Sequence, residues 1–168
     1  VYQGKAASSE IRLYHYGYNL SSGDMQRKYQ RTGELLKRQI AEDPDNTFAR
    51  ANLVRIYRAQ EDDAGAIVVG EEALQHNAPR ITSYHRQMIL TDMAYCHFVL
   101  AQYDQAETVC RRVLEENEEN LDVLFTLGGV NLQRGNYEQA MHWYKRFLEV
   151  KRLDQQKPRF TPLIVDTY

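Results

Sequence analysis

The chain has 168 residues, of which 43% are hydrophobic and 26% charged, and its formal net charge at pH 7 is −2. This length and apolar content fit one domain with a buried core. Acidic and basic residues are interspersed, which argues against a nucleic-acid interface, and no apolar run approaches the ~18 residues that a membrane-spanning helix needs.

Residues 1–22 predict an extended segment. Ile11, Leu13 and His15 alternate with polar or aromatic neighbours at the period of two that is typical of a strand. Gly17 and the Ser-Ser-Gly run at 21–23 end this pattern. A lone strand leaves its edges unpaired, so we expect it to need a partner that the helices do not supply.

Residues 24–46 predict a single amphipathic helix. Asp24 is a candidate N-cap, and Pro44 in the sequence Asp-Pro-Asp-Asn stops the helix. The apolar residues expected on one face are Tyr29, Leu35, Leu36 and Ile40.

Three later stretches, residues 47–80, 87–120 and 121–154, each predict a hairpin of two helices. The last is the clearest, and its two apolar stripes are Leu121, Leu124, Leu127, Gly128 and Leu132, then Ala140, Tyr144, Phe147 and Leu148. Between the stripes lies Arg-Gly-Asn at 134–136, where Gly and Asn tolerate the left-handed backbone that ends a helix. Gly128 and Ala140 are small where the two helix axes must approach closely.

The 121–154 stretch resembles the tetratricopeptide repeat, a helical hairpin of about 34 residues with small residues at its eighth and twentieth positions. Counting from Leu121, these positions hold Gly128 and Ala140. The same register covers 87–120 and, after an insertion at 81–86, also 47–80 and a half unit at 24–46. The insertion is expected to lengthen the next helix or to form a loop. The resemblance implies an all-α, right-handed solenoid of about seven helices over residues 23–154.

One unit departs from the repeat in the sizes of two residues. In 47–80, Val54 stands where a small residue is usual and Gly70 where a large one is usual. We expect either loose packing around Gly70 or a neighbouring side chain that fills the gap.

Residues 155–168 predict an extended tail, because Pro158 and Pro162 interrupt any helix. No polar capping helix follows residues 121–154, although repeat arrays usually end with one. The outer side of the last hairpin is therefore expected to be covered by the tail, by a second copy or by a partner.

Two cysteines, Cys96 and Cys110, are too few for a disulfide framework or a zinc site. Both lie in apolar helical stripes, which favours buried free thiols in a reducing compartment, the cytoplasm. A disulfide between them is the alternative. No signal peptide is visible, although the chain begins at Val1 and its true start could lie upstream.

A second resemblance rests on the HYGY sequence at 15–18 and on the RTGELLKRQIAEDPDNTF sequence at 31–48. These segments are similar to the C-terminal part of certain bacterial family-2 glycosyltransferases, in which a nucleotide-sugar domain precedes a tetratricopeptide tail. In that family a late histidine helps to hold the divalent metal, and His15 would be that ligand if such a domain precedes Val1. The nucleotide-binding sheet is absent from this chain, and Asp43 and Asp45 flank Pro44 at a helix end, where they suit capping. We therefore expect no catalytic residue, metal site or cofactor in this chain alone.

By resemblance, the first helices of the hairpins line a concave groove. The predicted groove residues are Phe48, Arg55, Arg58, Met88, Thr91, Tyr95, Phe98, Phe125 and Leu132, with Ala51, Asp122 and Gly129 at further groove positions. Aromatic residues beside two arginines suit a peptide with an acidic group or a C-terminal carboxylate. Alternatively, the tail, a preceding domain or a second copy covers these residues.

Two functional hypotheses follow. The first is a non-catalytic interaction scaffold, the tail of a larger glycosyltransferase, that mediates homo-oligomerisation through the terminal segments or the last repeat, or docks a protein acceptor. The second is a free-standing adaptor that binds a peptide in the groove. Both predict a protein or peptide partner, and neither involves nucleic acid or a membrane.

Overall fold

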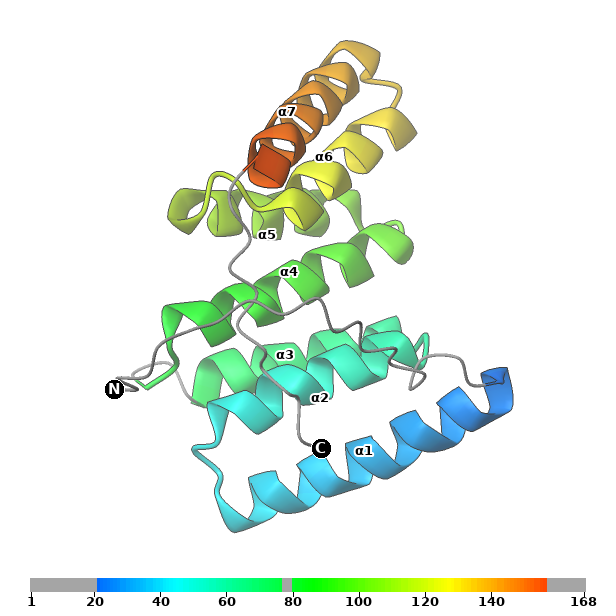
Figure 1. The fold of residues 1–168 in the computed structure, drawn as a ribbon, viewed down its shortest axis with the longest axis vertical. Coiled ribbons are helices and arrows are strands. Elements are labelled where there is room, and N and C mark those ends of the chain that lie inside the picture. The colour runs from blue at the N-terminus through cyan, green and yellow to red at the C-terminus, as the bar shows by residue number, and fades with distance from the viewer. Residues whose placement is uncertain (1–20, 77–79, 157–168) are drawn as a thin grey trace, which may run out of the picture.

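The computed structural model describes residues 21–76 and 80–156 (Figure 1). These residues form helices and no strand. The helices are α1 (Ser22–Glu42), α2 (Thr47–Ala59), α3 (Asp63–His76), α4 (Ser83–Val99), α5 (Tyr103–Glu116), α6 (Leu121–Gln133) and α7 (Tyr137–Gln156). The strand expected before Gly17 lies outside the described residues, as do the HYGY sequence and residues 157–168.

The seven helices stack in chain order from α1 at one end to α7 at the other (Figure 1). Each helix contacts the next one along the chain, and α4 also contacts both α2 and α6. The first helices of successive hairpins therefore lie beside one another. The prediction of an all-α stack of helical hairpins is confirmed for the described residues.

The N-cap of α1 is Ser21, so the prediction of Asp24 was wrong. The Ser21 hydroxyl oxygen accepts a hydrogen bond from the Asp24 backbone N–H at 3.2 Å, and Asp24 lies in the first turn, where a carboxylate favours the helix dipole. Ser22 is accordingly helical rather than extended. Asn46, Thr82 and Asn120 cap α2, α4 and α6 in the same way.

Three leucines predicted on apolar faces are exposed, and Leu132, at 46%, is one of them. Leu36 and Gly33 of α1 are buried, but Leu35 is 52% exposed, because the stripe that packs against α2 is narrow and Leu35 lies about 100° away from Leu36. Leu148 of α7 is 60% exposed, because none of the described residues forms a helix that covers that side of α7.

Three hairpin turns share one backbone feature. Glu61, Ala101 and Gly135 have φ angles of 62°, 57° and 75°, the left-handed conformation that turns the chain after the first helix. Ala101 and Gly135 are separated by one repeat length, whereas Glu61 and Ala101 are separated by one repeat length plus the insertion at 81–86. Helix α4 begins at Ser83, so most of the insertion lengthens the start of that helix.

The C-terminal boundary of the stack lies two residues later than expected. Helix α7 continues through Gln155 and Gln156, which the sequence pattern placed in the tail. No proline occurs in this helix before Pro158, so nothing in the sequence interrupts its backbone hydrogen bonds earlier.

A glycine allows close helix packing in two of the hairpins. It lies on the first helix of the last hairpin and on the second helix of the first full hairpin. In the last hairpin, a Cβ added to Gly128 of α6 would lie 2.5 Å from the ring of Tyr144 of α7. In the first full hairpin, a Cβ added to Gly70 of α3 would lie 2.6 Å from the sulfur of Met93 of α4. The second alternative for Gly70 is therefore correct: a neighbouring side chain fills its gap.

Candidate functional site

The predicted groove residues lie on α2, α4 and α6, and the structure brings several of them together across these helices. The Arg58 guanidinium of α2 lies over the Tyr95 ring of α4, with 4.3 Å between its central carbon and the ring centroid. The Phe98 ring of α4 lies against Gly129 of α6, where an added Cβ would be 2.9 Å away. We call the surface formed by the nine predicted residues the α2–α4–α6 face.

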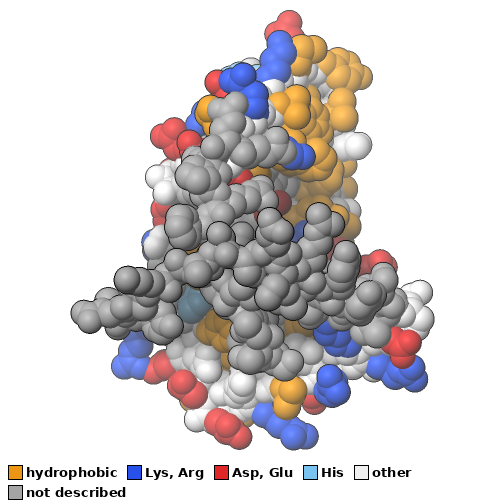
Figure 2. Space-filling model, in the orientation of Figure 1, with side chains coloured by type: hydrophobic (Ala, Val, Ile, Leu, Met, Phe, Trp, Pro, Cys, Tyr) orange, Lys and Arg blue, Asp and Glu red, His pale blue; other side chains and the backbone are white. Residues whose placement is uncertain are grey.

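Exposure divides the α2–α4–α6 face. The exposed members are Phe48, Arg55, Tyr95, Phe125 and Leu132, and the partly buried members are Arg58, Met88, Thr91 and Phe98. Ala51 and Gly129 are buried and offer no side-chain surface to a ligand. Figure 2 shows apolar side chains gathered over α6 and the adjoining part of α7. The α6 end of the face is thus the more apolar end.

Asp92 of α4 is the residue that sequence reasoning missed. Arg58 donates a hydrogen bond to its Oδ1 atom, and the Nε atom of Arg55 lies 3.9 Å from its Oδ2 atom. The Asp92 side chain is only 7% exposed. Burial raises the pKa of Asp92, and the hydrogen bond from Arg58 opposes this shift. A carboxylate flanked by Leu90, Met93 and other apolar residues was the available signal in the sequence.

This carboxylate changes what the two arginines can do. Arg58 is held by Asp92 on one side and by the Tyr95 ring on the other, so its charge is largely compensated. Arg55 keeps a side chain that is 59% exposed and makes only a long contact with Asp92. The carboxylate of Asp122 on α6 is also close enough to raise the pKa of Asp92. Of the two guanidinium groups, Arg55 is the less engaged and the one placed to meet a ligand.

An aromatic group continues the face from α6 onto α7. The Phe125 ring centroid lies 5.5 Å from those of both Tyr144 and Phe147. The ammonium group of Lys151 lies 5.5 Å from the centroid of the Phe147 ring. These tilted rings present apolar surface suited to a partner's aliphatic or aromatic side chain.

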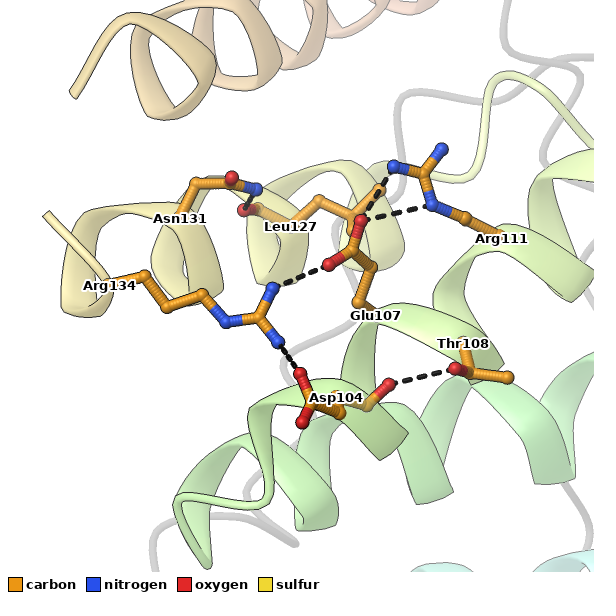
Figure 3. Close-up of polar contacts among 7 residues, drawn as sticks. All are labelled: Asp104, Glu107, Thr108, Arg111, Leu127, Asn131 and Arg134. Carbon is orange, nitrogen blue, oxygen red and sulfur yellow. Dashed lines mark hydrogen bonds and ion pairs between the residues drawn. The ribbon is translucent and has the colours of Figure 1, made fainter. Parts of the chain in front are cut away.

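The end of α6 is fixed to α5 by a network of charges (Figure 3). Arg134 binds both Asp104 and Glu107, and Arg111 also binds Glu107. The hydrogen bonds from Arg111 and Arg134 lower the pKa of Glu107. Within α6, the Asn131 amide donates to the Leu127 carbonyl oxygen at 2.9 Å. The network positions the part of α6 that carries Leu132.

A hollow of about 720 Å³ elsewhere on the described residues contains none of the predicted site residues. Its lining comes from α3, α4 and α5 and includes Glu71, Met93, His97, Asp104 and Arg112. The Nδ1 atom of His97 lies 2.7 Å from the Oε1 atom of Gln102, which ties this histidine to the turn before α5. We find no set of groups in this hollow that indicates a ligand.

The remaining chemical candidates give no site in the part of the chain that the structure describes. Cys96 and Cys110 are buried free thiols, so the disulfide alternative was wrong. Burial raises the pKa of both, that of Cys110 to about 12. Residues 21–76 and 80–156 contain no group of three or more side chains able to hold a metal ion. No helix in these two ranges combines the length and the apolar composition of a membrane-spanning segment. His15 lies outside these ranges.

Comparison with known proteins supports the repeat assignment. Residues 100–156 match the family model of the tetratricopeptide repeat. A crystal structure of MamA superposes with a TM-score of 0.63 at 17% identity, over 79% of this chain and 76% of that one. A structure described as MamA MSR-1 C2 gives a TM-score of 0.61 at 20% identity, over 76% and 70%. At these identities the likeness shows the fold alone. No curated protein sequence matches the chain.

Proposed function

We propose that this tetratricopeptide repeat domain is a non-catalytic interaction scaffold that binds an extended peptide on the α2–α4–α6 face. The observation that carries the proposal is the exposure of Tyr95, Phe125 and Leu132 on α4 and α6 together with that of Arg55 on α2, all on the α2–α4–α6 face. Aromatic residues and arginine are enriched among the residues that anchor protein-binding surfaces.

The charges on this face indicate the chemistry of the peptide. Arg55 would pair with one carboxylate of the peptide, because Asp92 already engages Arg58. An apolar side chain of the peptide would lie against Phe125 and Leu132. The favoured ligand therefore carries one acidic group and one aliphatic or aromatic side chain, rather than the run of acidic residues that two free arginines would favour.

Binding of short fluorescent peptides tests this proposal. One probe has the sequence Ala-Leu-Ala-Phe-Ala-Asp with an amidated C-terminus, and its control has Asn in place of Asp with the same amidated C-terminus. Arg55→Ala should weaken binding of the acidic probe by about ten- to 150-fold, since a charge-assisted hydrogen bond contributes roughly 1.5 to 3 kcal/mol. The same variant should leave the weaker binding of the control probe unchanged.

Matched variants separate charge from apolar contact in this experiment. Arg31→Ala removes an exposed arginine from α1 and should have no effect, whereas Phe125→Ala should weaken both probes. Circular dichroism should give the same helix content for every variant. Equal affinity of Arg55→Ala and the unaltered protein for the acidic probe would refute this use of the face.

The wider setting of the domain is proposed from sequence resemblance. A position at the C-terminal end of a bacterial family-2 glycosyltransferase, with a role in oligomerisation or acceptor docking, rests on the HYGY sequence and the segment at 31–48. A free-standing adaptor is equally compatible with the fold. The coding sequence upstream of Val1 decides between them, because the first proposal fails if no nucleotide-sugar domain is encoded there.

Two further proposals concern assembly and location. Light scattering tests self-association, since a strict monomer at all concentrations would argue against an oligomerising role. Buried reduced thiols at Cys96 and Cys110 suit a reducing compartment such as the cytoplasm. Localisation of the tagged full-length protein would check this.

A further inference from the structure

The last hairpin leaves a set of large apolar side chains uncovered within the described residues. Phe125 and Leu132 of α6 are 53% and 46% exposed, and Met141 and Leu148 of α7 are 56% and 60% exposed. We call these four residues the terminal face. Single exposed apolar residues are ordinary, but a group on two packed helices marks an interaction site.

The preceding unit shows what the two α6 residues of the terminal face are placed to contact. Thr91 holds the repeat position of Phe125 in that unit, and its hydroxyl accepts a hydrogen bond at 3.1 Å from Asn120, the N-cap of the next first helix. Phe98 holds the position of Leu132 and packs on Gly129 of the next first helix. At both positions, the side chain contacts the first helix of the following hairpin or its N-cap.

The two α7 residues of the terminal face also have counterparts at the same repeat positions of the preceding unit. Leu114 holds the repeat position of Leu148 in the preceding unit and packs against the main core. Glu107 holds the position of Met141 and binds Arg134, the C-cap of α6. Three positions of the terminal face therefore correspond to positions that contact the following hairpin in the preceding unit, and the fourth corresponds to Leu114, which packs against a core that includes Val123 and Leu127 of α6.

We infer that the terminal face binds an amphipathic helix of a partner protein, which takes the place of a following first helix. Lys145 and Arg152 lie one turn before and one turn after Leu148 on the same stripe of α7, Glu149 lies between them, and all three are exposed. The net positive charge of this group favours acidic residues on the flanks of the incoming helix. The partner segment thus has leucine-like residues along one face and glutamate or aspartate beside them.

Two other occupants fit the terminal face less well. A segment that imitates α2 or α6 needs a helix of 13 residues after a turn. The sequence at 157–168 includes Pro158 and Pro162, which interrupt a helix of that length. Two copies of α7 packed antiparallel about Leu148 would place Lys145 of one opposite Lys151 of the other, a repulsive pair of like charges. The partner helix meets neither obstacle.

Fluorescence anisotropy with the full chain and a synthetic helix tests the inference. The probe is a labelled peptide of about 18 residues, roughly five turns, with leucines spaced three and four apart and glutamates beside them. One control peptide has the same composition with its leucines scattered around the helix, and another has lysine in place of glutamate. Tight binding is expected for the acidic amphipathic peptide alone.

Variants locate the binding surface. Leu148→Asp should weaken binding of the acidic amphipathic peptide at least tenfold, whereas Leu35→Asp, which alters a leucine of similar exposure on α1, should not change it. Arg55→Ala should also leave binding unchanged, so this test is independent of the one for the α2–α4–α6 face. Because Leu148 is exposed, Leu148→Asp should keep the helix content of the unaltered protein.

Several results would overturn the inference. Equal binding of the scattered-leucine peptide, or no effect of Leu148→Asp, would show that the terminal face does not select a helix. Loss of binding in Tyr95→Ala but not in Leu148→Asp would place the peptide on the α2–α4–α6 face. Self-association that Leu148→Asp abolishes would identify a second copy as the occupant, and binding that requires deletion of residues 157–168 would identify the chain's own tail.

Discussion

The first full hairpin, α2–α3, and the last, α6–α7, place the small residue of their close helix contact on opposite helices. In α2–α3 the large residue is Val54 on the first helix and the small one is Gly70 on the second. In α6–α7 the small residue is Gly128 on the first helix, and Tyr144 on the second is large. The two pairs stand at equivalent positions of the repeat.

The difference lies in which helix fills the gap that each glycine leaves. Met93 of α4, a helix of the next hairpin, occupies the space over Gly70, whereas Tyr144 of the same hairpin occupies the space over Gly128. The α2–α3 hairpin therefore depends on its neighbour for close packing. The α6–α7 hairpin is closely packed within itself, and only its outer side lacks a neighbour in the described residues.

Of the stability changes predicted here, truncation of Met93, which packs against the first hairpin, should cause the largest loss in the free energy of unfolding. Met93 is 4% exposed, so Met93→Ala should lower the free energy of unfolding by about 3 kcal/mol through lost burial and a cavity. Gly70→Ala in the same chain adds a methyl group to that cavity and removes a helix glycine, so the double variant should recover about 1 kcal/mol. Urea denaturation measures both values.

The effect of Gly70→Ala on the stability of the Met93→Ala variant is the control for this prediction. If Gly70→Ala lowers the stability of Met93→Ala further, Met93 does not fill the space over Gly70. The m-values of the variants should match that of the unaltered protein, since a changed m-value would indicate that unfolding is no longer two-state.

Addition of a methyl group at Gly128 should disturb the last hairpin less severely. The new Cβ would lie 2.5 Å from the Tyr144 ring, so the ring or the helix must shift. We expect Gly128→Ala to cost about 1 to 2 kcal/mol, the usual cost of overpacking less the gain in helix propensity. The matched control is Gly23→Ala in α1, where no atom lies within 4 Å and no loss is expected. Equal thermal stability of the two variants would contradict the close contact.

Much of the fold could be predicted from the sequence, because hairpin packing leaves a periodic record. Small residues at Gly128 and Ala140 and the turn at Gly135 define the register of the last unit. Burial of single residues was less predictable, since it depends on neighbours that periodicity does not describe. Leu35 and Leu148 belong to apolar patterns yet are exposed, because no described helix covers their sides.

The candidate site was predictable as a set of positions but not as an arrangement of charges. Resemblance to the repeat placed Arg55, Arg58 and Tyr95 on the groove side of the first helices. Pairing of Arg58 with Asp92 joins residues far apart in the chain, and such a contact depends on how two helices are rotated against each other. The sequence could not show which of the two arginines stays available to a ligand.

The free energies of unfolding of Leu114→Ala and Leu148→Ala test most directly whether the last hairpin keeps the repeat register but leaves one side open. These leucines hold the same position in successive units, and only Leu114 packs against the main core. Leu114→Ala should cost about 2 kcal/mol and Leu148→Ala less than about 0.5 kcal/mol. Equal losses in the two variants would contradict an open terminal face.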